Sequence, residues 1–279
     1  MKMRSWSRIQ AILLRGAVYL SAVLTAGILI CLVIYILVKG IPHLSFNLFS
    51  FTYTTENVSM FPALINTITI TLLSLLIAVP LGIFSALYLV EYAKRGNRLV
   101  SLVRLTAETL AGIPSIVYGL FGFLLFVTTL GFGYSLLAGA LTLAIMILPV
   151  IMRTTEEALM SVPDSYREGS FGLGAGKLRT IFRIVLPAAM PGILAGIVLS
   201  VGRIVGETAA LIYTAGSVAQ IPANLLGSGR TLSVHMYALW TEGLFIEQSY
   251  ATAVVLLVIV IGLNTVSASI AKRLGKGKV

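Results

Sequence analysis

Six apolar stretches, each long enough to cross a lipid bilayer, determine what this chain can fold into. A helix rises about 1.5 Å per residue, so about 20 apolar residues cross the roughly 30 Å of hydrocarbon. Inside lipid the backbone must satisfy its own hydrogen bonds, which a single segment does only as a helix. The stretches are residues 17–38, 61–90, 105–130, 135–152, 186–214 and 251–270. The sequence therefore predicts an all-α membrane protein with six transmembrane helices.

The composition excludes a soluble globular protein. Hydrophobic residues make up 58% of the 279 residues and charged residues only 11%, which leaves too little polar surface to cover a domain of this size. The first apolar stretch follows basic residues, as in a signal peptide, but it is too long for one, and we expect it to remain a transmembrane helix. The single cysteine, Cys31, supports neither a disulfide nor a thiolate metal cluster.

Lysine and arginine are distributed unevenly between the two sides of the membrane. Six spans put both termini on one side, and 17 of the 20 basic residues lie on that side. They are Lys2, Arg4, Arg8, Arg15, Lys94, Arg95, Arg98, Arg104, Arg153, Arg167, Lys177, Arg179, Arg183, Lys272, Arg273, Lys276 and Lys278. By the positive-inside rule, both termini and segment 153–190 are cytoplasmic. This asymmetry explains the net charge of +10, so we expect no nucleic-acid partner.

The longest cytoplasmic segment predicts a helix, a turn and a second helix. Pro163 lies between Ser161 and Asp164, a combination typical of a helix start. Three glycines then interrupt the helix: Gly172, Gly174 and Gly176. A basic second helix follows and runs to Pro187. We expect this elbow to project from the membrane and to fit a cleft on another protein.

The glycines do not form a nucleotide-binding loop. A phosphate-binding loop needs a glycine five positions before Gly176 and a serine or threonine after Lys177, and the sequence has Phe171 and Leu178 there. No motif for a hydrolase, a zinc site or a thiol redox site occurs either. We therefore expect a non-catalytic chain without a cofactor, with any ATP bound by a partner.

The elbow resembles the EAA loop of ABC-importer permeases. Glu168 begins the pattern, Gly174 takes the glycine place, Ile184 follows at the family spacing, and Leu186 and Pro187 close it. Gly169 and Ser170 replace the usual alanines, and both are small. In that family the loop forms a coupling helix that inserts into a cytoplasmic ATPase. The resemblance implies that role for Glu168, Gly169, Ser170, Gly174, Ala175 and Lys177.

Two charged residues lie deep inside the fifth apolar stretch. Arg203 and Glu207 are four residues apart, which places them on the same helix face, and Ser200 extends that face. A buried arginine costs about 2.5 to 3.5 kcal/mol on insertion scales, so it should face a partner or a water-filled route. Its planar donors suit a tetrahedral oxyanion, and the carboxylate would favour release. A structural ion pair is the alternative.

Small residues and prolines shape the spans around this face. Gly192, Gly196 and Ser200 form a stripe that allows another helix to approach closely, either within this chain or from a partner permease. Prolines that can kink a helix lie in four spans: Pro80, Pro114, Pro149 and Pro191. Kinked, closely packed helices suit a transporter but also occur in static bundles.

Residues 202–209 and 112–122, together with the elbow, resemble permeases of the phosphate-specific ABC importer, and residues 208–216 and 231–237 resemble its A type. The resemblance implies the type I permease fold in a bacterial or archaeal plasma membrane, and a role of Arg203, Glu207, Ser200 and Thr208 in passage of inorganic phosphate. It also implies a C-type permease as heterodimer partner, two copies of a cytoplasmic ATPase, an external phosphate-binding protein, and membrane lipid around the chain.

The resemblance divides the chain into three parts. Residues 1–60 are an N-terminal tail, the first helix and an external loop, residues 61–272 are the permease core with coupling loop 153–190, and residues 273–279 are a basic tail. Two other functions remain open on the sequence. One is a permease for molybdate, sulfate or phosphonate, and the other is a membrane scaffold or sensor that transports nothing.

Overall fold

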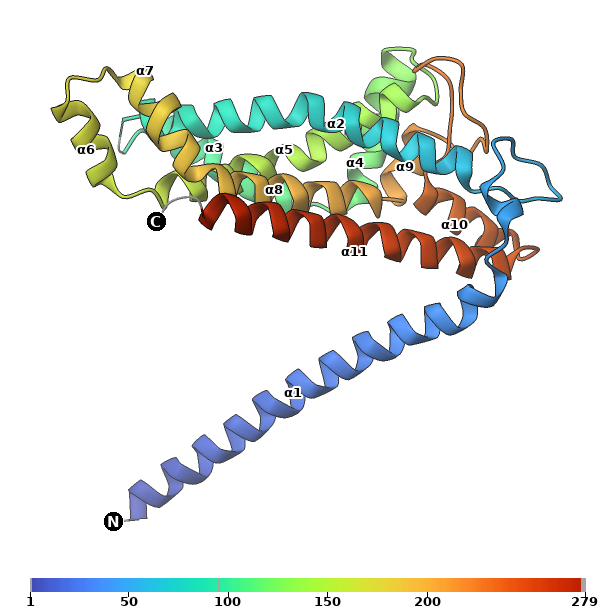
Figure 1. Ribbon diagram of the computed structural model, residues 1–279, viewed down its shortest axis with the longest axis horizontal. Coiled ribbons are helices and arrows are strands. Elements are labelled where there is room, and N and C mark those ends of the chain that lie inside the picture. Colours follow the sequence, from blue (N-terminus) through green and yellow to red (C-terminus); the bar gives the residue numbers. More distant parts are fainter. Residues whose placement is uncertain (1, 95, 277–279) are drawn as a thin grey trace.

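A computed structural model describes residues 2–94 and 96–276 as an all-helical protein (Figure 1). The α-helices are α1 (Lys2–Gly40), α2 (Phe61–Leu87), α3 (Arg98–Ala111), α4 (Ser115–Gly122), α5 (Leu136–Met160), α6 (Asp164–Gly172), α7 (Lys177–Thr180), α8 (Leu186–Val205), α9 (Ala209–Thr214), α10 (Leu232–Glu242) and α11 (Ile246–Lys276). Short 3-10 turns cover Ile41–His43 and Phe46–Phe49. π-Helical turns extend α2 over Tyr88–Tyr92 and α4 over Phe123–Thr129, and a third, Ile181–Val185, joins α7 to α8.

Five helical segments of the described chain are long and apolar enough to cross a membrane, and a bent pair of helices provides a sixth crossing if it counts as one span. The five are Ala11–His43, Phe61–Tyr92, Leu136–Met160, Lys177–Val205 and Ile246–Val266. The expectation of six spans therefore holds in number, with a correction to the third. The predicted stretch 105–130 is not one helix.

The third stretch bends by 102° between α3 and α4. Pro114 adopts an extended conformation immediately before α4 and does not continue α3. A proline lacks the backbone donor and disfavours helix in the residue before it, so the chain turns at this point. Of the four prolines expected to kink a span, Pro114 is the one at which a helix is interrupted, whereas Pro80, Pro149 and Pro191 lie within α2, α5 and α8.

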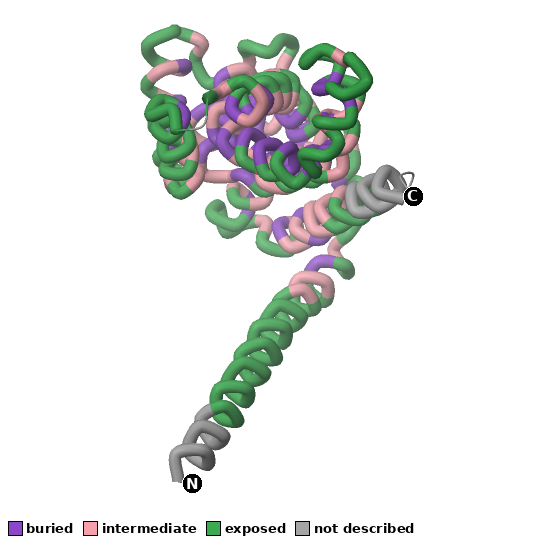
Figure 2. The backbone as a smooth tube through the Cα atoms, turned by 90° about the vertical axis from the view of Figure 1, so that its left-hand side faces the viewer, coloured by how far each residue is buried: buried purple, intermediate pink, exposed green. Residues whose placement is uncertain are grey.

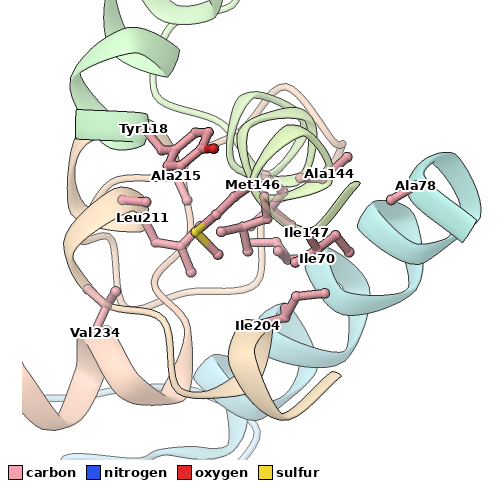
Figure 3. Close-up of a cluster of buried hydrophobic side chains, with 14 of the residues drawn as sticks. Ile70, Ala78, Tyr118, Ala144, Met146, Ile147, Ile204, Leu211, Ala215 and Val234 are labelled. Carbon is pink, nitrogen blue, oxygen red and sulfur yellow. The ribbon is translucent and has the colours of Figure 1, made fainter. Parts of the chain in front are cut away.

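Helix α5 forms the centre of the bundle. Its buried residues include Met146 and Ile147, which pack with Ile204 of α8, Leu211 of α9 and Tyr118 of α4 (Figure 3). Helices α2 and α8 pack on α5 over much of their length. The end of the fifth apolar stretch, where the charged residues lie, is thus held directly against the protein core.

The small-residue stripe of α8 faces α5 of the same chain. A Cβ atom at Gly192 would lie 2.7 Å from Ala158 Cβ, and one at Gly196 would lie 2.0 Å from Thr154 Oγ1. Larger residues would push the two helices apart, so glycine is required by the close approach. The packing interpretation of the stripe is confirmed, and the seam is internal.

Helix α1 diverges from the bundle and exposes apolar side chains along most of its length (Figures 1 and 2). It touches the rest of the chain at its end, where Gly40 is buried and a Cβ there would lie 2.4 Å from the Tyr250 carbonyl oxygen. Such a surface is stable only against lipid or another membrane protein. The end of α11 and the elbow lie at the same end of the bundle (Figure 1), in agreement with a cytoplasmic C-terminus.

Candidate functional site: an elbow joined to an intramembrane arginine

The cytoplasmic elbow has the predicted shape. Helix α6 ends at Gly172, Gly174 takes a left-handed conformation with φ of +81°, and α7 begins at Lys177. The predicted helix start is confirmed, because α6 begins at Asp164 directly after Pro163. The Ser161 hydroxyl donates to the Ala158 carbonyl and so closes α5, while α6 begins after Pro163 without a side-chain cap.

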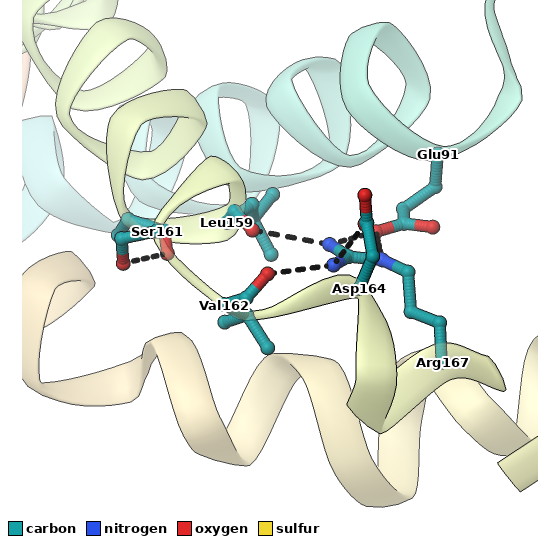
Figure 4. Close-up of polar contacts among 7 residues, drawn as sticks. Glu91, Leu159, Ser161, Val162, Asp164 and Arg167 are labelled. Carbon is teal, nitrogen blue, oxygen red and sulfur yellow. Dashed lines mark hydrogen bonds and ion pairs between the residues drawn. The ribbon is translucent and has the colours of Figure 1, made fainter. Parts of the chain in front are cut away.

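Arg167 of α6 fastens the elbow to the end of α2 (Figure 4). Its Nη2 lies 2.8 Å and its Nε 3.0 Å from Oε1 of Glu91. The same guanidinium donates to the carbonyls of Val162 at 2.8 Å and Leu159 at 3.1 Å. The side chain of Arg167 is 14% exposed and that of Glu91 is 9% exposed, so the pair is largely shielded from water. Two hydrogen bonds from one planar guanidinium to the same carboxylate fix the angle between α6 and the end of α2.

Two further contacts close the elbow. The hydroxyls of Ser170 and Thr180 lie 2.8 Å apart and join α6 to α7. The Lys177 ammonium lies 4.6 Å from the centre of the Tyr92 ring, on the turn that extends α2. Ser170 and Lys177, both expected to touch an ATPase, therefore also hold the elbow together. Ala175 is partly buried in the turn, and its amide donates to the Ser170 carbonyl.

The tip of the elbow exposes apolar side chains. Leu173 is 91% exposed, and Phe171 and Tyr166 are about half exposed. Glu168, Gly169 and Gly174 are exposed beside them. No described part of the chain covers this tip, and an exposed apolar cluster with a polar border is typical of a protein docking surface.

The elbow continues into the membrane as one helical segment. Lys177–Val205 runs through the π-helical turn into α8 without a break. The predicted stretch 186–214 is not continuous, however, because the helix ends at Val205 and restarts as α9 at Ala209. The Glu207 carboxylate accepts a hydrogen bond of 3.1 Å from the Ala210 amide. Glu207 therefore caps the new helix start.

Arg203 lies in the last turn of α8, partly exposed and near enough to Tyr118 for electrostatic interaction. Among the described residues it forms neither an ion pair nor a hydrogen bond, and Glu207 is committed to its cap. The structural ion pair between Arg203 and Glu207 is thus not formed within the described part of the chain. The Ser200 hydroxyl donates to the Gly196 carbonyl of its own helix, and Thr208 is partly exposed at the break. The break separates Thr208 from the helix that carries Arg203.

His235 lies in the external part of the chain and is fully buried in α10. Burial, and secondarily the Arg230 guanidinium, lower the pKa of the His235 ring to about 3. An unfolded histidine has a pKa near 6.5. Below about pH 6.5 the His235 ring is protonated in the unfolded state but stays neutral in the folded state. The free energy of unfolding therefore falls as the pH drops from 6.5 toward 3.

We predict a loss of about 2 kcal/mol between pH 6.5 and pH 5 from this residue, at about 1.4 kcal/mol per pH unit. Thermal unfolding of the purified protein at several pH values measures the effect. His235→Gln should unfold with a flatter pH profile, since its side chain does not titrate. The same slope in both proteins would contradict the assignment, because the other histidine, His43, is present in both.

The comparisons with known proteins agree on one family. Residues 78–278 match the family described as binding-protein-dependent transport system inner membrane component. The probable ABC transporter permease protein YqgI of Bacillus subtilis is 35% identical over 82% of this chain and 83% of its own length. The phosphate transport system permease protein PstA 1 of Mycobacterium tuberculosis is 42% identical over 70% of this chain and 64% of its own length, slightly under two thirds.

PstA of Haemophilus influenzae is 36% identical over 75% of this chain and 74% of its own length. Among solved structures, a bacterial alginate ABC transporter shares the fold, with a TM-score of 0.60 over 89% of this chain and 95% of that chain at 21% identity. The chain belongs to the inner-membrane components of binding-protein-dependent transport systems.

Proposed function

We propose that this chain is the A-type permease of an ATP-driven phosphate importer and forms the transport route with a second, C-type permease. Relatives named as phosphate permeases match most of the chain. The observation that carries the proposal is a single helical segment, Lys177–Val205, that joins an exposed elbow to an unpaired arginine within the membrane. Arg203, with Glu207, Ser200 and Thr208 around it, is proposed to line the phosphate route.

Family membership makes the chain a multi-pass inner-membrane subunit that works with an ATPase and a binding protein and performs no bond chemistry itself. We further propose two copies of the ATPase and an external phosphate-binding protein. The exposed tip around Leu173 fits a cleft of the ATPase because it is apolar, small-residue-rich and held rigidly by Arg167. Movement of the elbow would tilt α8 and expose Arg203 alternately to the two sides.

Uptake by the reconstituted complex tests the proposal. The chain, a second permease and the ATPase in liposomes, with binding protein outside, should accumulate radiolabelled phosphate only with ATP inside. Sulfate and molybdate uptake should be at least tenfold slower. Faster uptake of sulfate or molybdate than of phosphate would identify that oxyanion as the cargo. A complex that assembles but transports none of the three oxyanions would favour the scaffold or sensor function.

Gly174 provides a test of the elbow itself. Its φ of +81° strains any residue with a branched Cβ, while no atom lies within 4 Å of the position a Cβ would take. Gly174→Val should therefore reshape the turn without disturbing the bundle, and transport-coupled ATP hydrolysis should fall at least tenfold. Gly174→Asn, which tolerates this conformation better, should keep most of the activity. Equal activities of the two variants would show that the turn shape is not needed for coupling.

A further inference from the structure

Arg230 is a buried cation that has no counter-ion among the described residues. It lies in the external loop before α10 with 4% of its surface exposed. Its Nε and Nη2 atoms are buried and have no hydrogen-bond partner in the part of the chain that the structure describes. The guanidinium carbon lies 4.8 Å from the centre of the Tyr53 ring, and a ring face stabilises a cation without using its N–H donors. A buried charge normally needs a partner, so the two free donors require an explanation.

The unpaired Nε and Nη2 donors have the geometry that binds an oxyanion. Nε and Nη2 form one edge of the planar guanidinium and point their hydrogens in parallel, which matches two oxygens of a carboxylate or phosphate. Among the described residues no carboxylate pairs with Arg230. The Arg230 backbone is fixed on both sides, because its amide donates to the Val218 carbonyl and its carbonyl accepts from Asn66. The side chain is thus anchored at its base while its donor edge is unoccupied.

The surroundings of Arg230 favour an anion. Arg230 immediately precedes the eleven-residue helix α10, and the N-terminus of a helix attracts negative charge. The hydroxyls of Thr231 and Ser233 lie 3.1 Å apart at that terminus. His235, one turn further on, is fully buried, and neither ring nitrogen has a hydrogen-bond partner of normal geometry. Its ring meets the same Tyr53 edge to face, with centroids 6.2 Å apart.

This cluster connects directly to the break in the fifth span. The Ser233 hydroxyl donates to the Glu207 carbonyl at 2.5 Å. Glu207 lies four residues after Arg203 and caps α9. A single hydrogen bond therefore links the N-terminus of α10 to the segment that follows Arg203. This link lies on the external side of Arg203.

The ring of Tyr53 lies over the Arg230 guanidinium. Val58, further along the same segment, has a φ of +46°, which is a genuine outlier for a β-branched residue. Val58 is buried, and Ser59 and Met60 after it are hydrogen-bonded to the Leu48 carbonyl. The segment is thus held in place beyond Tyr53, so the Tyr53 ring is the part of it that can move off the guanidinium.

We propose that Arg230, the N-terminus of α10 and His235 form an external oxyanion site that receives phosphate before it reaches Arg203. The site rests on the proposed function, since the cargo supplies the anion. The Arg230 edge binds two phosphate oxygens, and the positive N-terminal end of α10 attracts the anion, while the Leu232 amide and the Thr231 and Ser233 hydroxyls stay in their hydrogen bonds within the chain. The Tyr53 ring moves aside to admit the anion.

Binding of inorganic phosphate to the purified permease complex, without binding protein, tests the site. Equilibrium binding of radiolabelled phosphate in chloride buffer should be saturable in the unaltered complex. Arg230→Gln should weaken it at least tenfold, and Arg98→Gln, at an exposed arginine outside both sites, should leave it unchanged. Saturable binding that is unchanged in Arg230→Gln would overturn the proposal, as would the absence of any binding, which would leave ordered water as the partner of the guanidinium.

A second variant covers the case in which Arg230→Gln fails to assemble. Arg230→Lys keeps the charge and the contact with Tyr53 but lacks the two-donor edge, so it should assemble normally and still bind phosphate several-fold more weakly. Tyr53→Leu is the matched control, because it removes the ring and leaves the donors; its binding should change less than that of Arg230→Lys. Liposome uptake is measured in parallel. If the unaltered complex takes up phosphate but Arg230→Lys binds it as well as the unaltered complex does, the external site is rejected and the phosphate function stands. If the unaltered complex takes up no phosphate, the phosphate function itself is rejected.

Discussion

Replacing Arg203 by alanine should abolish phosphate uptake while the complex still assembles. Arg203 forms no ion pair or hydrogen bond in the described part of the chain, so its removal leaves no partner unsatisfied. An arginine at this depth costs about 2.5 to 3.5 kcal/mol on insertion scales, and the alanine variant should be at least as stable. We expect uptake into liposomes to fall more than a hundredfold, with the melting temperature unchanged or raised.

The conservative variant separates charge from geometry. Arg203→Lys keeps the cation but cannot donate two parallel hydrogen bonds, and it should retain a small fraction of the uptake. A normal rate of phosphate uptake by the Arg203→Ala variant would show that Arg203 is not part of the phosphate route. A loss of assembly in Arg203→Ala would instead assign Arg203 to the contact with the second permease.

Replacing Arg167 by alanine should uncouple transport from ATP hydrolysis. Arg167 holds α6 to Glu91 and to two backbone carbonyls, and both partners of the ion pair are largely buried. Removing one partner of a buried pair costs about 3 to 5 kcal/mol. The elbow should then hinge freely at Pro163, so that the ATPase still binds but no longer moves α8. We expect uptake to fall at least tenfold, with ATP hydrolysis continuing in the absence of binding protein.

The control for Arg167→Ala is an arginine without a buried partner. Arg98 is exposed at the start of α3 and forms no ion pair among the described residues, so Arg98→Ala should change uptake little. Glu91→Gln removes the same ion pair from the other side and keeps hydrogen-bond acceptors, and it should show a milder form of the same uncoupling. Normal coupling in both Arg167→Ala and Glu91→Gln would show that the elbow does not need this anchor.

The sequence predicts those parts of the molecule that depend on local chemistry. Runs of apolar residues indicate the spans because lipid requires them wherever the fold places a helix. Gly174 marks the elbow turn because its backbone conformation is disfavoured for other residues. Arg203 stands out because a cation in lipid is costly, and the structure indeed leaves it without a partner inside the chain.

The remaining features depend on contacts between distant segments. Arg167 and Glu91 are 76 residues apart in the chain, and in the sequence both look like ordinary cytoplasmic charges. Glu207 has the spacing of a partner for Arg203, yet it caps α9 because the helix ends before it. The bend at Pro114 was detectable only as a proline within an apolar stretch, and three similar prolines lie inside helices. Which proline interrupts its helix is decided by packing around it.

The interruption after α8 has a consequence for how motion passes along the chain. Lys177–Val205 is a segment of 29 residues, about 43 Å long at 1.5 Å per residue, and it tilts as one rod when its cytoplasmic end is pushed. Residues 206–208 end that rod, and α9 starts a separate helix after them. A tilt of the rod therefore reaches α9 only through this three-residue break, which limits how far a push on the cytoplasmic side can open the chain on the external side.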